Sequence, residues 1–235
     1  MRIVSWNCCW QKEGFTGEKR NEILKLNPDI LIVQECKQDD WKKLNYSSEK
    51  GDWYGDDKDS QGDPNKKLGI GIFCKNEKYS IDCSLFRGKD LSNKRYVIPY
   101  KITGAKEPFV LYAVWTKKPP DSKSNYHTPV YNVLGDPPSP IENAIFIGDF
   151  NTGSIQRATN ARWYNDLKYR FAKNGFLNCA NGQEWVPTFF RGRSSWLDDH
   201  CFATDDFKVI SFGIGNRDYW QEYSDHCPII VDFAF

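Results

Sequence analysis

The chain alternates between short runs of β-branched or aromatic residues and polar segments, a pattern that predicts several strands separated by loops and helices. Residues 3–6 and 30–33 are two such apolar runs. Between them, residues 18–26 place isoleucine and leucine among charged residues and precede Asn27-Pro28, which is typical of a helix and its end. The chain is therefore predicted to begin as strand, helix, strand.

Apolar runs continue through the rest of the chain. Strands are predicted at residues 68–73, 96–102, 109–115, 144–147, 201–203, 207–214 and 229–233. Residues 158–173 have the spacing of a helix, which Asn174-Gly175 would end, and residues 125–134 are predicted to hold a short helix. Residues 46–67 are rich in Gly, Asp, Ser and Lys, so we predict a long surface loop there, on the substrate side of the protein.

Strands dominate this pattern and helices are interspersed among them. Two packed sheets flanked by helices fit that order better than a doubly wound parallel sheet. The proline-rich stretches 119–120 and 137–140 are too short to be interdomain linkers, and no internal repeat is evident. A length of 235 residues is within the range of one such unit, so we expect a single domain over residues 1–235.

Composition narrows the classes of function. The 32 basic and 31 acidic residues give a formal net charge of +1, so any contact with nucleic acid depends on local basic patches. The eight cysteines form no Cys-x-x-Cys pair, which argues against a zinc ribbon and favours free thiols in a reducing compartment. No run approaches the roughly 18 apolar residues of a membrane span, and the first residues do not resemble a secretory signal. We expect a cytoplasmic protein that does not enter membranes.

Polar residues that can do chemistry flank several predicted strands. They are Asn7, Glu35, Asp149, Asn151, Asp225 and His226. Any one of them alone is typical of a solvated strand end. A rigid sheet can, however, hold such side chains toward one shared cleft, and carboxylates beside an imidazole suit chemistry on a phosphate. Together they predict one active-site cleft shared by the strand ends.

The motifs that contain these residues occur in the order typical of the endonuclease/exonuclease/phosphatase superfamily. They are Ser5-Trp6-Asn7, Val33-Gln34-Glu35, Gly148-Asp149-Phe150-Asn151 and Ser224-Asp225-His226. The match spans nearly the whole chain, which is most similar to the compact bacterial, exonuclease III-like members. The resemblance implies an α/β fold, a four-layered sandwich of two packed, mainly antiparallel β-sheets flanked by helices, and a metal-dependent phosphoester hydrolase.

The resemblance also implies a metal site. By that pattern Glu35 is the main metal ligand, and Asn7 and Asp225 lie at or near the metal. Hard oxygen ligands of this kind suit Mg²⁺, for which Mn²⁺ is expected to substitute.

The same pattern assigns the catalytic residues. Asp149 would activate the attacking water, Asn151 would help to position it, and His226 with a partner carboxylate would bind the scissile phosphate, in one step without a covalent intermediate. Successive strand residues face opposite ways, so only one of Asp198 and Asp199 can face His226. The family pattern fits Asp199, and we predict that Asp199 is the partner.

The chain departs from the family where many nucleases have a Tyr or His that contacts the phosphate. Trp115 stands there, and an indole is a single neutral donor. We predict Trp115 and Lys117 as substrate-binding residues, with Lys117 supplying positive charge, although a solvated strand-end lysine explains that position equally well.

Cysteines mark a second departure. Cys9 replaces an acid that some members place two residues after the first asparagine, so metal binding is expected to depend more heavily on Glu35. Cys8, Cys36 and Cys227 directly follow functional positions and are predicted to be small core residues rather than nucleophiles.

The predicted function is a magnesium-dependent nuclease acting on DNA or RNA, a monomer whose partner is its nucleic-acid substrate and which needs no obligate protein partner. Residues that could contact a backbone are Lys66, Lys67, Lys117, Lys118, Lys123, Arg191 and Arg193, with the exposed-looking aromatics Trp53 and Tyr54. The alternatives are a small-molecule or lipid head-group phosphodiesterase or phosphatase, a deadenylase-like activity, and a non-catalytic binding protein that kept the fold.

Overall fold

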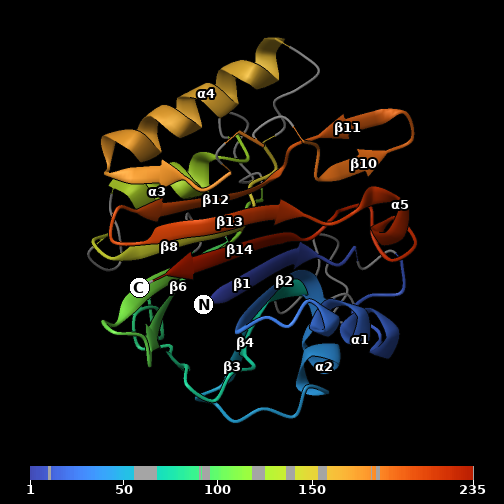
Figure 1. Ribbon diagram of the computed structural model, residues 1–235, viewed down its shortest axis with the longest axis vertical. Helices are drawn as coiled ribbons and strands as arrows, with labels where there is room; N and C mark the ends of the chain where they lie inside the picture. The colour runs from blue at the N-terminus through green and yellow to red at the C-terminus, as the bar shows by residue number, and fades with distance from the viewer. Residues whose placement is uncertain are drawn as a thin grey trace.

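Two six-stranded sheets pack face to face in the computed structural model, and helices cover their outer faces (Figure 1). The structure describes residues 1–9, 12–55, 68–89, 91, 96–117, 125–135, 141–152, 158–180, 182–183 and 186–234, with the backbone alone for 158–161.

The first sheet has the strand order β13-β14-β1-β2-β4-β3. Its strands are β1 (Arg2–Asn7), β2 (Ile30–Lys37), β3 (Gly51–Gly55), β4 (Leu68–Cys74), β13 (Lys208–Ile214) and β14 (Ile229–Ala234). The pair β1 and β2 runs parallel, and the other neighbours run antiparallel. The carboxyl ends of β1 and β2 therefore meet at one edge, where Asn7 is in register with Gln34.

The second sheet has the order β5-β6-β7-β8-β12-β9. Its strands are β5 (Ser80–Asp82), β6 (Val97–Thr103), β7 (Phe109–Trp115), β8 (Ala144–Asp149), β9 (Phe176–Asn178) and β12 (Asp199–Thr204). The pair β7 and β8 is parallel, so their carboxyl ends also share an edge. A separate hairpin joins β10 (Phe189–Arg191) to β11 (Ser194–Trp196).

Apolar residues form three clusters that account for the layers. One fills the space between the sheets and includes Leu111 and Ile145. On the outer face of the second sheet, α3 (Thr128–Gly135) and α4 (Ala158–Lys173) pack through residues such as Phe171. On the outer face of the first sheet, α1 (Gly17–Lys25) and α2 (Gln38–Lys42) pack through residues such as Ile23 and Trp41. The predicted four-layered sandwich, α, β, β, α, is confirmed.

The long loop predicted over residues 46–67 is wrong for its middle part. Residues 51–55 form β3 and pair with β4, whereas residues 56–67 lie outside the described residues. The polar composition hides this strand because β3 is a sheet edge whose position is set by pairing and by the packing of Trp53. The sequence also does not predict the short elements α2, β5, β9, β10, β11 and α5 (Arg217–Trp220). Within the described residues, no helix has the length and apolar character needed to cross a membrane.

Gly148 lies at a close approach between strands β7 and β8. Its φ is +146°, and a Cβ built on it would lie 2.0 Å from the backbone oxygen of Val114 and 2.9 Å from Gln34 Nε2. The Val114 oxygen cannot retreat without disturbing the pairing of the two strands. Glycine is therefore required next to Asp149, the last residue of β8.

The variant Gly148→Ala is expected to lower the free energy of unfolding by roughly 2–5 kcal/mol, because the strained backbone and the steric clash both add to the cost. Urea denaturation measures the change. The matched control is Gly213→Ala on β13, where a Cβ meets no atom within 4 Å and no positive φ is required. Equal losses in the two variants would contradict the close approach.

Candidate active site

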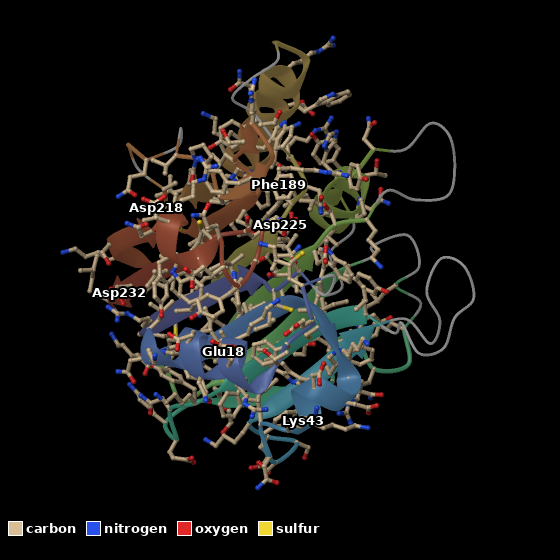
Figure 2. All side chains as sticks on the ribbon, turned by 90° about the vertical axis from the view of Figure 1, so that its right-hand side faces the viewer. Glu18, Lys43, Phe189, Asp218, Asp225 and Asp232 are labelled. Atoms are coloured by element: carbon tan, nitrogen blue, oxygen red, sulfur yellow. The ribbon has the colours of Figure 1, made fainter. Side chains whose placement is uncertain are left out.

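Residues predicted for the catalytic and metal sites meet at one edge of the sandwich. Asn7 ends β1, Asp149 ends β8, Asp199 begins β12, and His226 comes just before β14. This edge is on the right of Figure 1 and faces the viewer in Figure 2, where Phe189 and Asp225 are labelled near the centre. The first sheet supplies one part of the site and the second sheet the other.

Asn7 links two carboxylates from different sheets. Its Nδ2 donates to Asp149 Oδ2 at 2.9 Å and to Glu35 Oε1 at 3.2 Å, and its side chain is buried. Its Oδ1 accepts a hydrogen bond from the backbone N–H of Cys9 at 3.0 Å. Because that N–H can only donate, it determines which end of the amide faces the acids. Asn7 therefore aligns Glu35 with Asp149.

Glu35 projects from a β-bulge. The pairing of β2 with β4 shifts register between Val33 and Cys36, and Glu35 has a φ of +56°. A bulge changes the direction of a side chain, and a left-handed conformation at a residue with a Cβ costs on the order of 1–3 kcal/mol. The sequence predicts that the strand ends at Val33, but β2 continues through the bulge to Lys37. The strained conformation brings the Glu35 carboxylate to Asn7.

Asp149 is buried and held by two N–H donors. Its Oδ2 accepts from Asn7, and its Oδ1 accepts from the backbone N–H of Asn151 at 2.8 Å. Asn151 itself has a φ of +47°, and its Nδ2 donates to the backbone oxygen of Thr116 at 3.0 Å. Both oxygens of Asp149 are thus fixed in direction, which suits a group that must accept a proton from one position.

His226 pairs with Asp199, and not with Asp198. The Nδ1 of His226 lies 2.8 Å from Asp199 Oδ2, and both side chains are buried. The Phe189 ring packs against the imidazole with 4.7 Å between ring centroids. Asp199 sits opposite Asp149 across β12 and β8. The arrangement orients the imidazole and leaves its Nε2 as the second ring nitrogen available for a substrate.

The charges of this group shift two pKa values. Burial opposes the charged form of His226, but the charge of Asp199 and the hydrogen bond to it, with the charges of Asp149 and Asp225, raise the pKa of His226 to about 10. His226 is therefore protonated near neutral pH and can donate from Nε2. Burial raises the pKa of Asp149 well above its usual range, and the charge of His226 opposes that shift. The charge of His226 favours the ionised carboxylate, which is the form of Asp149 that can accept a proton.

The variant Asp199→Asn is expected to lower kcat on the order of 10²-fold or more, because His226 loses its charged partner. Asp198→Asn is expected to lower kcat far less, since Asp198 makes no hydrogen bond to the imidazole. The hydrolysis of bis-p-nitrophenyl phosphate at saturating Mg²⁺ measures both. Equal losses, or a larger loss for Asp198→Asn, would overturn the assignment of the partner.

Three positioning residues were not predicted from the sequence. The Thr188 hydroxyl accepts from the backbone N–H groups of Asp198 and Asp199, each at 3.1 Å. The Ser224 hydroxyl donates to the backbone oxygen of Asn7 at 2.7 Å and accepts from the N–H of His226 at 3.0 Å.

The third positioning residue, Lys19, is buried on α1, and its Nζ donates to the backbone oxygens of Cys8 at 2.6 Å and Cys9 at 3.3 Å. Only Ser224 has a sequence signal, its place in the Ser-Asp-His motif, whereas Thr188 and Lys19 follow no pattern that separates them from ordinary polar residues.

The two predicted substrate-binding residues contact each other beside the site. Trp115 is in register with Asp149 but only 4% exposed, and it stacks on Tyr96 with 5.3 Å between ring centroids. The Nζ of Lys117 lies 4.1 Å from the centroid of the Trp115 ring. Because Trp115 is buried, little of its surface is accessible to a substrate, whereas Lys117 is partly exposed.

The other candidates for nucleic-acid contact have different placements. Arg191 and Arg193 are exposed in the β10–β11 hairpin. Lys66, Lys67, Lys118 and Lys123 lie outside the described residues. The expectation that Trp53 and Tyr54 are exposed is wrong, because both side chains are partly buried. The indole N–H of Trp53 donates to the backbone oxygen of Cys36 at 3.1 Å. The ring of Tyr54 packs edge-on against other aromatic rings.

All eight cysteines lie in the described part of the chain, unpaired and buried. Cys8, Cys36 and Cys227 belong to the apolar cluster between the first sheet and helices α1 and α2, so they are core residues, as predicted. Burial raises the pKa of the Cys227 thiol to about 12, so it is a poor nucleophile. Cys9, in the place of a family acid, is 7% exposed, and burial together with the charge of Asp225 raises its pKa to about 11.

The donors around Glu35 fit a hard cation. Glu35 and Asp225 are partly exposed, and the Glu35 carboxylate lies beside the amide of Asn7. In the described part of the chain, no three His, Cys, Asp or Glu side chains are grouped as a complete metal site. Mg²⁺ typically takes one or two protein carboxylates and completes its shell with water and substrate phosphate, so this sparse set of oxygens suits it.

The fold is shared with solved structures at low sequence identity. The endonuclease domain of TRAS1, a telomere-specific non-LTR retrotransposon, aligns with a TM-score of 0.69 and 16% identity, covering 99% of this chain and 97% of that one. D. rerio TDP2, complexed with single strand DNA product, aligns with a TM-score of 0.64 and 15% identity, covering 100% of this chain and 99% of that one. The Bacteroides thetaiotaomicron mannosyl-6-phosphatase aligns with a TM-score of 0.57 and 16% identity, covering 100% of each chain. Such a likeness shows the fold and does not select a substrate.

The sequence matches a family model as well. Residues 4–226 match the model of the Endonuclease/Exonuclease/phosphatase family, and this span includes all of the site residues described above. No curated protein matches the chain in sequence. The chain belongs to the Endonuclease/Exonuclease/phosphatase family, whose members hydrolyse phosphoester bonds.

Proposed function

We propose that residues 1–235 act as one domain that hydrolyses phosphodiester bonds in nucleic acid with Mg²⁺ as its cofactor. The observation that carries the proposal is a single hydrogen-bonded group at the sheet edge. In it, Asn7 joins Glu35 to Asp149, next to the buried pair of Asp199 and His226. A carboxylate for a hard cation, a base and a charged donor thus lie side by side, as hydrolysis of a phosphodiester requires.

The chain's own residues carry the proton transfers. Asp149 accepts a proton from the attacking water, which Asn151 helps to position. The water oxygen bonds to phosphorus as the bond to the leaving oxygen breaks. His226 donates Nε2–H to a non-bridging phosphate oxygen while Asp199 holds its Nδ1–H, so the growing negative charge meets a fixed positive one. No residue forms a bond to phosphorus, so the reaction has one chemical step.

The cofactor would be held by Glu35, with Asp225 and Asn7 beside it. When bound, Mg²⁺, or Mn²⁺ in its place, polarises a phosphoryl oxygen and stabilises the leaving group. The bulge at Glu35 and the hydrogen bond from Asn7 orient the carboxylate before any ion binds.

Nucleic acid is the favoured substrate for two reasons. The structural neighbours include an endonuclease domain and a protein complexed with single strand DNA, and the exposed Arg191 and Arg193 stand close in sequence to the site. A phosphatase among the neighbours keeps a small-molecule phosphoester as the second candidate. A net charge of +1 means that few phosphates are neutralised at once, so the salt dependence should correspond to about two to four contacts. A cytoplasmic location and a monomeric state belong to the same proposal.

One panel of substrates at fixed Mg²⁺ tests the proposal. It contains single-stranded DNA, duplex DNA with and without an abasic site, RNA, bis-p-nitrophenyl phosphate, an inositol phosphate and sphingomyelin. We expect turnover of at least one nucleic acid and of bis-p-nitrophenyl phosphate. Turnover confined to the inositol phosphate and sphingomyelin would refute the nucleic-acid substrate and leave the catalytic residues standing. Turnover of nothing in the panel would favour a binding protein.

A further inference from the structure

A pocket rich in cations opens next to the candidate active site. It has a volume of about 470 Å³, and its lining includes Lys12, Phe190, Arg191, Arg217, Gln221 and Asp225. We refer to it as the Arg217 pocket. Three of these residues are cations, and the acid among them, Asp225, directly precedes His226. The pocket and the site therefore share a wall at Asp225, which is labelled near the middle of Figure 2.

The pocket is held together by contacts between segments that are distant in sequence. The backbone N–H of Phe190, on β10, donates to the backbone oxygen of Asp225 at 2.8 Å. The guanidinium carbon of Arg217, on α5, lies 4.5 Å from the centroid of the Phe190 ring. The Nζ of Lys12 donates to the backbone oxygen of Gln221 at 2.7 Å. Three cation-bearing segments are thus fixed around one opening.

The cations of this pocket outnumber the one acid in its lining, Asp225. Elsewhere Arg2, Lys25 and Arg170 each form an ion pair with a neighbouring acid. In the described part of the chain, Lys12, Arg191 and Arg217 form no ion pair with a carboxylate, and all three are exposed. On a protein with a net charge of only +1, such a local excess of positive charge favours an anion.

We propose that the Arg217 pocket binds a phosphate that neighbours the scissile one in a nucleic-acid strand. The proposal rests on the proposed function, because a substrate with a single phosphate would leave the pocket unused. Guanidinium groups match the geometry of phosphate oxygens, and the Phe190 ring holds Arg217 in place before binding. The pocket thereby adds phosphate-backbone contacts that do not depend on base sequence.

The test uses the full chain and a short, fluorescein-labelled single-stranded oligonucleotide, as DNA and as RNA. The double variant Arg191→Ala with Arg217→Ala is expected to raise Kd about tenfold, measured by fluorescence anisotropy in EDTA. The slope of log Kd against log salt is expected to become shallower by about 0.7 for each lost contact, so by about 1.4 in total. The KM for the oligonucleotide should rise more than the KM for bis-p-nitrophenyl phosphate, which has a single phosphate.

The matched control removes two cations at the opposite end of the sheet. Lys101 and Lys106 are exposed near the turn that joins β6 to β7, and β7 runs from that turn toward Asp149. The double variant Lys101→Ala with Lys106→Ala is expected to leave Kd and the salt slope unchanged. Lys12→Ala gives a second test in a segment other than the β10–β11 hairpin and α5, and it should raise Kd by several-fold.

The outcomes separate the two proposals. If the wild-type protein hydrolyses bis-p-nitrophenyl phosphate but binds neither oligonucleotide, the nucleic-acid function and the Arg217 pocket are both refuted. If the wild-type protein binds and cleaves the oligonucleotide while the arginine double variant and Lys12→Ala match the control, only the pocket is refuted. A rise in Kd for the arginine variants that exceeds the control, with a shallower salt slope, supports it.

Discussion

Replacing Asp149 by Asn should lower kcat by about 10²–10⁴-fold at saturating Mg²⁺, the range typical of removing a general base. Two N–H donors already point at this carboxylate, from Asn7 and from the backbone of Asn151. An amide in that place cannot accept a proton from water, and its own N–H group would face one of those donors. Hydrolysis of bis-p-nitrophenyl phosphate over a range of Mg²⁺ concentrations gives kcat and the metal requirement separately.

The matched control for this variant is Asp205→Asn. Asp205 is exposed in the turn between β12 and β13, at the end of β12 opposite Asp199, so the same change of charge should leave kcat unchanged. Circular dichroism shows whether both variants keep the fold. A folded Asp149→Asn protein that retains more than a tenth of the wild-type kcat would exclude Asp149 as the base.

Removing the metal should abolish hydrolysis, since the oxygen donors beside Asn7 are suited to a hard cation and the reaction would lose the charge that stabilises its leaving group. Excess EDTA is expected to stop turnover, and added Mg²⁺ or Mn²⁺ to restore it. Glu35→Gln should raise the Mg²⁺ concentration that gives half-maximal rate by at least about tenfold, with part of kcat recovered at saturation.

The control for Glu35→Gln is Glu107→Gln in the exposed segment between β6 and β7, far from the site edge. Its metal requirement should equal that of the wild-type protein. Two results would contradict the proposal that Glu35 binds the metal and Asp149 acts as the base. One is full turnover in excess EDTA. The other is a Glu35→Gln protein that recovers no activity at saturating metal.

The sequence alone predicts the layers well, because burial patterns determine them. Apolar runs locate the central strands, and the helix over residues 158–173 matches α4 in both bounds. Edge elements are harder to predict. β3 has a Gly-Asp-Trp-Tyr-Gly sequence that lacks an apolar run, and its strand conformation comes from pairing with β4. The short hairpin β10–β11 likewise depends on contacts with distant residues, including the bridge between Phe189 and His226.

The site shows the same division between local and tertiary information. Motifs identify Asn7, Asp149 and His226, and strand alternation narrows the partner of His226 to one of two acids. The bulge at Glu35 depends on how β2 pairs with β4, which the local sequence does not reveal. Thr188, the residue before β10, orients Asp199 through its hydroxyl, an interaction that exists only once the chain has folded.

The hydrogen bond between Asn7 and Asp149 crosses from one sheet to the other, and its geometry therefore depends on the spacing of the two sheets. Glu35 and His226 belong to the first sheet and its connections, whereas Asp149 and Asp199 belong to the second. The side chains between the sheets, such as Leu111, thus set the distance between Asp149 and Asp199 on one sheet and Glu35 and His226 on the other. A change of volume in that core is therefore expected to alter turnover as well as the stability of the fold, because interiors are close-packed and transmit such changes.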